Sequence, residues 1–338
     1  MKKITFLFAV MAFNGCNKSN KHNFSTAPVV EKSELLTKAS TYFKSVSTLT
    51  EENISQEKID LGKKLFYDKA LSKNQTISCN SCHNLEAYGI DNKSFSLGDT
   101  KELGARNSPS VVYSSLDSMQ FWDGRAKDVE EQAKGPLLNP VEHGIPNIPF
   151  LEKRLRAIPE YQTMFKNVFP NDKQPITFDN LANAIGAFER QLIPKSKFDD
   201  YLDGNETALN DKEKKGLNSF IENGCVSCHA GVALGGQIFQ KFGVYGDYSK
   251  VTQSKKIDKG LADLTKKEND QFMFKVPGLR NVEKTWPYFH DGSVYSLTKA
   301  VQMMGKLQLN KDISDEDAND MVTFLKTLTA DVDAKYKQ

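Results

Sequence analysis

Two copies of one short motif hold the residues with the most distinctive chemistry in this chain. Residues 79–83 read CNSCH and residues 225–229 read CVSCH, so each copy has two thiols three positions apart and a histidine directly after the second. Such thiols can add to the two vinyl groups of a porphyrin, and the imidazole can then bind the iron. Zinc is the alternative for paired cysteines, but a zinc site does not require a histidine after both pairs. The sequence therefore predicts two covalent c-type haems, held by Cys79, Cys82, His83, Cys225, Cys228 and His229.

The fifth cysteine lies in an N-terminal segment that predicts export. Two lysines are followed by an apolar run over residues 4–13 and then by Cys16. This pattern predicts a signal peptide over residues 1–15, of the lipoprotein type, with Cys16 as the lipid-anchored first residue of the mature chain. An ordinary secretory signal with an incidental Cys16 is the alternative. Both interpretations place the protein in the bacterial periplasm, the side of the membrane on which c-type haem is attached.

Charge and composition restrict the possible partners. The net charge is +2, and two of the lysines lie in the predicted signal, so the mature chain is close to neutral. No strongly basic segment argues for nucleic acid, and docking to a charged redox partner would depend on a local patch. The apolar run is too short to span a membrane, so we expect a membrane contact only through lipid on Cys16. Residues 16–45 are predicted to be a flexible tether.

An internal repeat indicates the helices that must position the two motifs. Gly62 and Phe66 precede the first motif with the same mutual spacing as Gly216 and Phe220 before the second. We expect two related helices in which the glycine lets another helix cross closely. Further helices follow from apolar residues at helical spacing, and Ser314 is expected to start one of them. Their apolar positions are Leu181, Ile185, Phe188 and Leu192 in one helix and Met321, Phe324, Leu325 and Leu328 in the other.

Strand signals are few, and the segments between the predicted helices are long and rich in Gly, Pro and Asn. The predicted fold class is therefore all-α, with two cytochrome c-like domains that carry one covalent haem each. The N-terminal domain is placed at residues 46–195 and the C-terminal domain at residues 196–338. The last residues of the chain are expected to pack back on the first domain.

Two further stretches carry a resemblance to a known family. Residues 121–142 (FWDGRAKDVEEQAKGPLLNPVE) and 274–293 (FKVPGLRNVEKTWPYFHDGS) resemble the signature stretches of the bacterial dihaem cytochrome c peroxidases, the superfamily that includes the MauG proteins. The match runs from about Gly62 to about Leu328, in order. It implies reduction of hydrogen peroxide to water with electrons from a small c-type cytochrome or a cupredoxin, and a possible homodimer. The alternatives are a MauG-like oxidase of a partner protein and a non-enzymatic dihaem electron carrier.

The resemblance implies distinct roles for the residues around the first haem. The haem on His83 would be the site of peroxide reduction. Splitting the O–O bond requires a group that takes a proton from peroxide and delivers it to the departing oxygen, and a carboxylate can do both. Glu142 matches the family's position for that group, and Gln132 matches the amide beside it. Trp122 resembles the family's electron relay between the haems, although a buried core tryptophan is the plain alternative.

The haem on His229 would store an electron, with Met304 as the sixth ligand of its iron and Met303 packed beside it. A tyrosine at that position would instead indicate an enzyme of the MauG type. The alternative is that both methionines simply fill a core. The resemblance also implies an interdomain calcium ion, bound by Asn107 and by the backbone carbonyls of Thr285 and Pro287, with waters completing the shell.

One residue departs from the family's pattern. Many members have a distal histidine in the loop after the first motif, and that histidine caps the iron until the other haem is reduced. In this chain Asp99 stands at the corresponding position, and no histidine occurs between His83 and His143. We therefore expect an iron that no loop histidine caps and an enzyme that needs no reductive activation. His143, next to Glu142, is a nearby candidate for an alternative cap.

Overall fold

The computed structural model describes Met1, residues 32–50 and residues 52–338. The predicted signal peptide, Cys16 and the first part of the predicted tether lie outside these residues. Within the described part, no helix is both long enough and apolar enough to cross a membrane. The body from Ser33 to Gln338 forms one compact unit.

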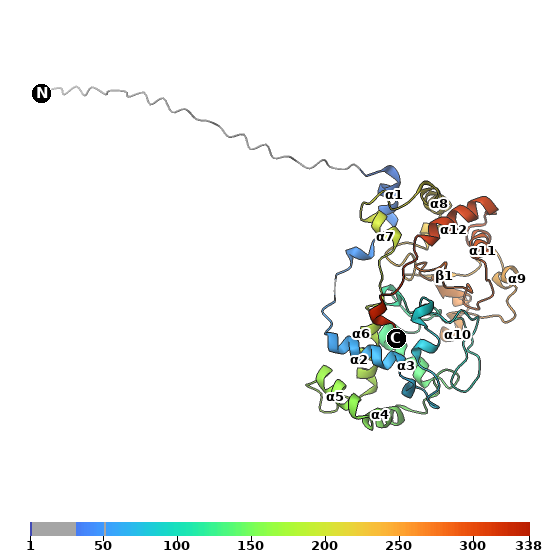
Figure 1. The fold of residues 1–338 in the computed structure, drawn as a ribbon. Coiled ribbons are helices and arrows are strands. Elements are labelled where there is room, and N and C mark those ends of the chain that lie inside the picture. Colours follow the sequence, from blue (N-terminus) through green and yellow to red (C-terminus); the bar gives the residue numbers. More distant parts are fainter. Residues whose placement is uncertain (2–31, 51) are drawn as a thin grey trace. The chain divides into compact units, whose positions relative to one another are not determined.

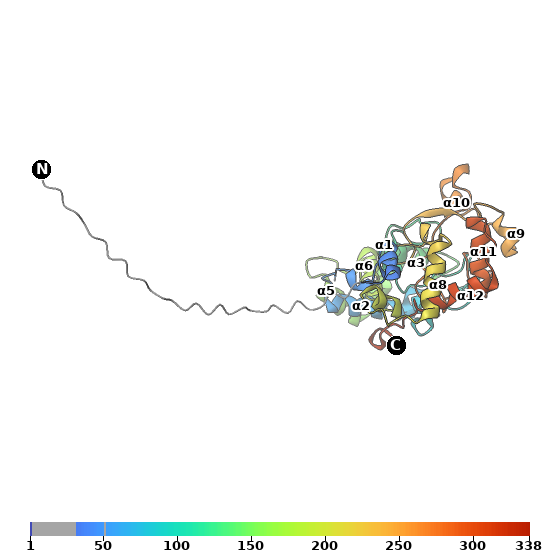
Figure 2. The ribbon, with the colours of Figure 1, turned by 90° about the horizontal axis from the view of Figure 1, so that it is seen from above.

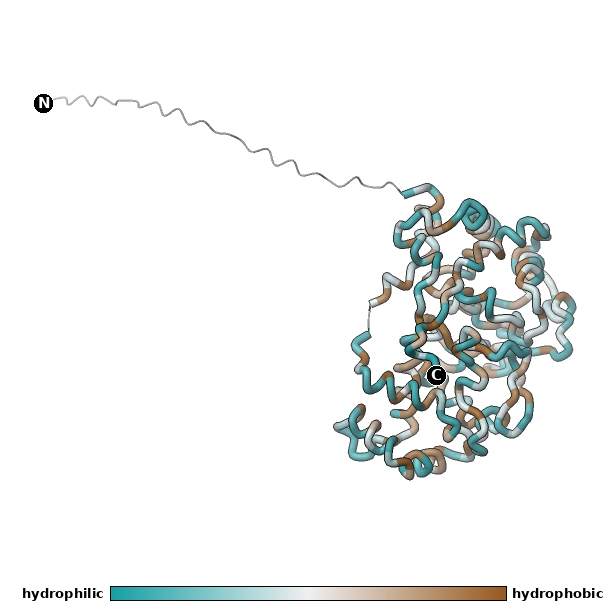
Figure 3. Tube along the Cα trace, in the orientation of Figure 1, coloured by the Kyte–Doolittle hydropathy of each residue, from teal (hydrophilic) through white to brown (hydrophobic). Residues whose placement is uncertain are grey.

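The body is mostly helical, as predicted. Brown and teal alternate along most of the helices in Figure 3, as expected for elements with one buried and one exposed face. The α-helices are α1 (Glu34–Tyr42), α2 (Gln56–Tyr67), α3 (Val129–Leu138), α4 (Ile148–Arg156), α5 (Pro159–Val168), α6 (Phe178–Glu189), α7 (Lys197–Leu202), α8 (Asp211–Glu222), α9 (Tyr248–Thr252), α10 (Ala262–Thr265), α11 (Leu297–Leu309) and α12 (Asp315–Lys326).

Two short strands form the one sheet of the described residues. They are β1 (Phe239–Lys241) and β2 (Met273–Lys275). The strands pair antiparallel, with Gln240 opposite Phe274. Beyond Lys275 the chain enters the segment that contains several of the predicted site residues.

The predicted repeat is confirmed as two matching helix crossings, which are visible in Figures 1 and 2. In the first half, α2 crosses α6 so closely that a Cβ added to Gly62 would lie 1.9 Å from the carbonyl oxygen of Ala184. In the second half, α8 crosses α12, and a Cβ on Gly216 would lie 2.0 Å from the carbonyl oxygen of Asp320. Only glycine permits backbones to approach this closely.

The structure also has helices at two other predicted places. Ser314 caps α12, because its hydroxyl accepts a hydrogen bond from the backbone N–H of Asp317 at 3.0 Å. In α6 the predicted apolar residues are buried, and Thr177 caps the helix. Leu192 is buried too, but it lies beyond the end of α6.

The predicted tether is wrong from Ser33 onward. Ser33 caps helix α1, and Leu36, Ala39 and Phe43 are buried in the core of the second half, against Phe198, Phe220 and Phe324. The pattern of three apolar residues in a short polar segment gave no sign of a partner more than 150 positions away.

The C-terminal residues, by contrast, pack on the first half. Val332 and Tyr336 join a cluster of the first half that contains Ile59, Phe66 and Phe188. The hydroxyl of Tyr67 donates to the carbonyl of Tyr336 at 3.1 Å. Each end of the body therefore completes the core of the other half.

A buried ion pair of the second half lies against the first half. The side chains of Arg280 and Asp199 are 1% and 0% exposed, and two hydrogen bonds of 2.8 Å connect them. The Arg280 guanidinium lies over the ring of Tyr113, from the first half, and donates to the carbonyl of Val232. Val232 belongs to the loop after the second motif, so this pair fixes that loop.

Candidate active site

The first motif borders a large cavity. Cys79 starts a 3-10 turn, and the backbone N–H of His83 donates to the carbonyl of Cys79 at 2.9 Å, so the turn presents both thiols and the imidazole together. All three side chains line a cavity of about 910 Å³, a volume within the usual range for cofactor pockets. Burial lowers the pKa of His83, which favours the neutral imidazole that binds metals.

The second motif has the same local geometry. The backbone N–H of His229 donates to the carbonyl of Cys225 at 3.0 Å. Nδ1 of His229 lies 3.2 Å from the carbonyl oxygen of Leu234, which leaves Nε2 for an iron. Burial lowers the pKa of His229 to about 4. The four motif cysteines are unpaired, so both motifs fit covalent haem.

Glu142 lies in the wall of the first cavity. It follows helix α3, which ends at Leu138, and Asn139 beyond that end donates from Nδ2 to Oε1 of Glu142 at 2.7 Å. Burial raises the pKa of the Glu142 carboxyl, and nearby Arg125 and the bond from Asn139 partly offset that rise. A carboxyl held in this way can accept a proton and return it.

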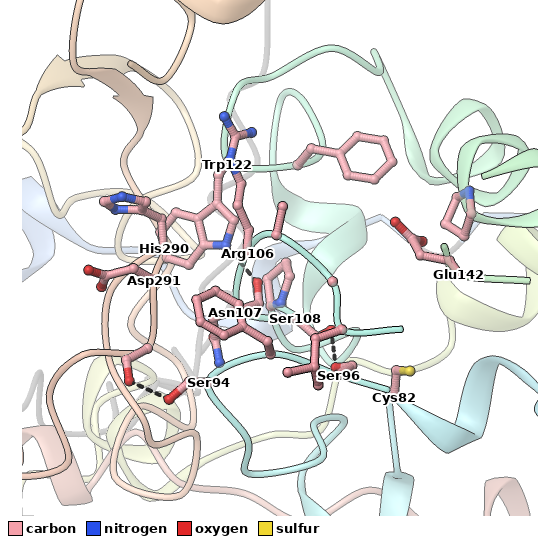
Figure 4. A pocket seen from close by; sticks show the side chains of 18 of the residues that line it. Cys82, Ser94, Ser96, Arg106, Asn107, Ser108, Trp122, Glu142, His290 and Asp291 are labelled. Carbon is pink, nitrogen blue, oxygen red and sulfur yellow. Dashed lines mark hydrogen bonds between the residues drawn. The ribbon is translucent and has the colours of Figure 1, made fainter. Parts of the chain in front are cut away.

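Gln132, on α3, lines the same cavity. The structure therefore places His83, Gln132 and Glu142 in the lining of one cavity, and their roles stay predictions. Figure 4 shows Glu142 and Cys82 at one side of the cavity and Trp122 with His290 at the other.

Trp122 lies between the cavity and the packing of the second half. Its indole N–H donates to the carbonyl of Asn107 at 2.9 Å, and its ring lies edge-on to His290 with centroids 6.3 Å apart. Trp122 lines the cavity and also packs in an apolar cluster that includes Phe274 and Met304. It thus contacts the surroundings of both predicted haem sites.

Met304 lies on α11 and is partly buried in that cluster, whereas Met303 packs in a neighbouring one. Val301, one turn earlier, borders the same core as Cys225. Helix α11 therefore runs beside the second motif. Ligation by Met304 stays a prediction.

The residues predicted to bind calcium lie in loops that meet beside the cavity. Asn107 donates from Nδ2 to the carbonyl of Lys93 at 2.8 Å, and its backbone N–H donates to His290. Asn92 of the same loop donates to the carbonyl of Trp286, between Thr285 and Pro287. No cluster of three or more acidic, histidine or cysteine ligands occurs among the residues the structure describes.

Asp99 does not line the cavity. Its carboxylate is 2% exposed and binds the loop at residues 72–76. His143 does line the cavity, and its Nδ1 is 3.0 Å from the carbonyl oxygen of Leu71.

Sequence reasoning missed two arginines at the cavity. Arg125 stacks on Phe121, with its guanidinium carbon 3.4 Å from the ring centroid, and pairs with Asp123. Arg106 donates to Asp123 and to Asp258, both at 2.6 Å. The charges of the WDGR stretch could have indicated Arg125, but Asp258 is 152 positions from Arg106 and no local pattern connects them.

Comparisons with known proteins agree with this geometry. The profile of the family described as di-haem cytochrome c peroxidase matches residues 56–207, and that of cytochrome c matches residues 213–329. A cytochrome c551 peroxidase of Nitrosomonas europaea is 45% identical over 85% of this chain and 83% of its own length. One of Pseudomonas aeruginosa is 43% identical over 91% and 89%. The crystal structure of a MauG-like protein associated with microbial copper homeostasis has a TM-score of 0.73 and 32% identity, over 82% of this chain and 90% of that one.

Proposed function

This chain belongs to the di-haem cytochrome c peroxidases, and from that premise we propose that it reduces hydrogen peroxide in the cavity of His83. One peroxide, two protons and two electrons give two waters, and two molecules of a reduced small c-type cytochrome supply the electrons. A cupredoxin is the alternative donor. The observation that carries the proposal is the partly buried Glu142 carboxyl in the wall of the cavity that contains the first motif. A MauG-like oxidase is disfavoured, because the MauG-like relative is less similar than the peroxidases.

Each residue of the cavity has a defined task in this proposal. A haem held by Cys79, Cys82 and His83 would supply an iron that can bind peroxide and pass on the electrons of the donor. Ionised Glu142, oriented by Asn139, takes a proton from the inner peroxide oxygen and delivers it to the departing one. Gln132 offers an amide that can hold peroxide or water. With both haems bound, Trp122 would relay electrons between them, and Met304 would help to hold the second haem.

Replacing Glu142 by Gln tests the proposal directly. We expect kcat for peroxide-dependent oxidation of reduced cytochrome c to fall by roughly 10²–10⁴-fold, because the proton carrier is lost. Haem content and the absorption of the second haem should not change. Glu131→Gln, an exposed neighbour on α3, is the matched control. Full turnover in Glu142→Gln would contradict the role of Glu142, and no turnover in the wild type would favour an electron carrier.

We also propose that the oxidised enzyme is active without prior reduction. The support is that Asp99 cannot serve as a haem cap and that its carboxylate is turned into the protein. Stopped-flow mixing of oxidised and half-reduced enzyme with peroxide should give the same initial rate without a lag. A fully low-spin, bis-histidine spectrum of the first haem in the oxidised protein would contradict this.

Three further proposals rest on the sequence and the resemblance. The chain is exported by a signal peptide and works in the periplasm, anchored by lipid on Cys16. A calcium ion binds Asn107 with the carbonyls of Thr285 and Pro287. The protein forms a homodimer. Sensitivity of signal-peptide processing to globomycin tests the lipid anchor. Loss of bound calcium on chelation tests the calcium site, and the mass from sedimentation tests the homodimer.

A further inference from the structure

The carboxylate of Asp99 is buried and is bound entirely by one neighbouring loop. Oδ1 accepts from the hydroxyls of Ser72 at 3.0 Å and Thr76 at 2.6 Å, and from the backbone N–H of Thr76 at 3.3 Å. Oδ2 accepts from the backbone N–H of Asn74 at 2.7 Å. An ionised carboxylate can accept all four bonds, whereas a neutral side chain of the same size cannot.

The backbone of Asp99 and of the residue before it contacts the loop of Glu142. The N–H of Asp99 donates to the carbonyl of Glu142 at 2.8 Å. Gly98 packs so tightly that an added Cβ would lie 1.7 Å from the carbonyl oxygen of Val141. The hairpin at residues 96–104, in which Leu97 pairs with Leu103, therefore lies directly on the Glu142 loop.

The loop at residues 72–76 also contacts the loop at residues 139–145. The N–H of Lys73 donates to the carbonyl of His143 at 2.8 Å, and Nδ1 of His143 bonds the carbonyl of Leu71 at 3.0 Å. The loop at 72–76, the hairpin at 96–104 and the loop at 139–145 thus contact one another pairwise. Asp99 is the residue that bonds both of the other segments.

We propose that Asp99 is a positioning residue, which holds the main chain of Glu142 so that its carboxyl stays in the wall of the cavity. The inference rests on the proposed function, because it assigns Asp99 a task that acts through Glu142. Asp99 itself does not touch the cavity. Its effect should therefore be on the rate of the chemical step and not on peroxide binding.

Asp99→Asn preserves the size of the side chain and removes its charge. We expect kcat to fall by roughly ten- to a hundredfold, since small misplacements of a reacting group cost about that much, while KM for peroxide changes little. Thr76→Val, which removes one bond and leaves the carboxylate, should cause a smaller loss in the same direction. Asp60→Asn, an exposed aspartate of α2, is the matched control and should retain wild-type kcat.

A double-mutant cycle distinguishes positioning from general damage. If Asp99 acts through Glu142, then Asp99→Asn should cause no further loss in a Glu142→Gln background. An equal fold-loss in both backgrounds would overturn the proposal, and so would an unchanged kcat in Asp99→Asn alone. Should Asp99→Asn fail to fold with both haems, Thr76→Val is measured in the same two backgrounds.

Amide hydrogen exchange of the haem-loaded protein provides a second readout that needs no turnover. We expect the backbone of residues 139–145 to exchange faster in Asp99→Asn, while α8 and α12 keep wild-type protection. Unchanged exchange at 139–145 would overturn the proposal. Because this measurement is independent of activity, faster exchange in a protein that does not reduce peroxide would point to a failure of the proposed function instead.

Discussion

The cation beside Glu142 influences the pH at which that carboxyl is ionised. Burial raises the pKa of Glu142 and Arg125 lowers it. In Arg125→Gln the pKa should therefore rise further. Because the free enzyme needs ionised Glu142, the acid limb of the kcat/KM profile should move to higher pH. Lys127→Gln, which removes an exposed charge nearby, should leave the limb in place, and an equal movement in both variants would refute the assignment.

A second carboxyl of the cavity predicts a pH-dependent stability. Glu189 is 5% exposed, and burial, aided by Glu130, raises its pKa to about 8. The folded protein therefore binds this proton more tightly than the unfolded chain, so the contribution to stability is complete below the unfolded pKa and is lost as the pH rises through about 8.

Replacing Glu189 by Gln should remove that loss. The measured quantity is the melting temperature of the variant minus that of the wild type. We expect this difference to be roughly 2–4 °C larger at pH 9 than at pH 5. Thermal unfolding of the haem-loaded proteins measures the difference. Exposed Glu57→Gln is the control, and a difference that does not vary with pH would contradict the raised pKa.

At the scale of elements, the two glycine crossings are the features most sensitive to substitution. Gly62→Ala and Gly216→Ala would each place a Cβ within 2.0 Å of a carbonyl oxygen of the facing helix. The helices must move apart, which should cost roughly 1–3 kcal/mol of unfolding free energy. Gly246→Ala, whose Cβ would meet only a side chain at 3.5 Å, is the control. Chemical denaturation measures all three, and equal costs would show that the crossings are not responsible.

The elements also show what a sequence can and cannot predict. Helices α6 and α12 were predictable because apolar residues recur at helical spacing over several turns and the capping residues are adjacent in sequence. The motifs predicted His83 and His229 because covalent haem needs adjacent residues. Helix α1 was missed because the reason for its order lies in Phe198 and Phe324, far along the chain. The same holds for Arg106, whose charge is balanced by Asp258, 152 positions further along the chain.

At the scale of the whole molecule, the exchange of ends between the halves is a source of stability. Ending the chain after Ala330 would remove Val332 and Tyr336 from the first-half cluster. We expect a loss of about 2–4 kcal/mol and faster amide exchange in α2 and α6, with α8 and α12 little affected. Lys335→Ala keeps both apolar side chains and should behave as wild type. Uniformly faster exchange would show instead that the two halves unfold as one unit.

The same exchange of ends has a consequence for how the protein is made. A ribosome delivers the first half well before residues 332–336, yet those residues complete its core. The core of the second half, in turn, includes α1, which is synthesised before the residues it packs against. A chain that is cut short therefore leaves its peroxide site on an unfinished support. The first half therefore has its complete core only after residues 332–336 have been made.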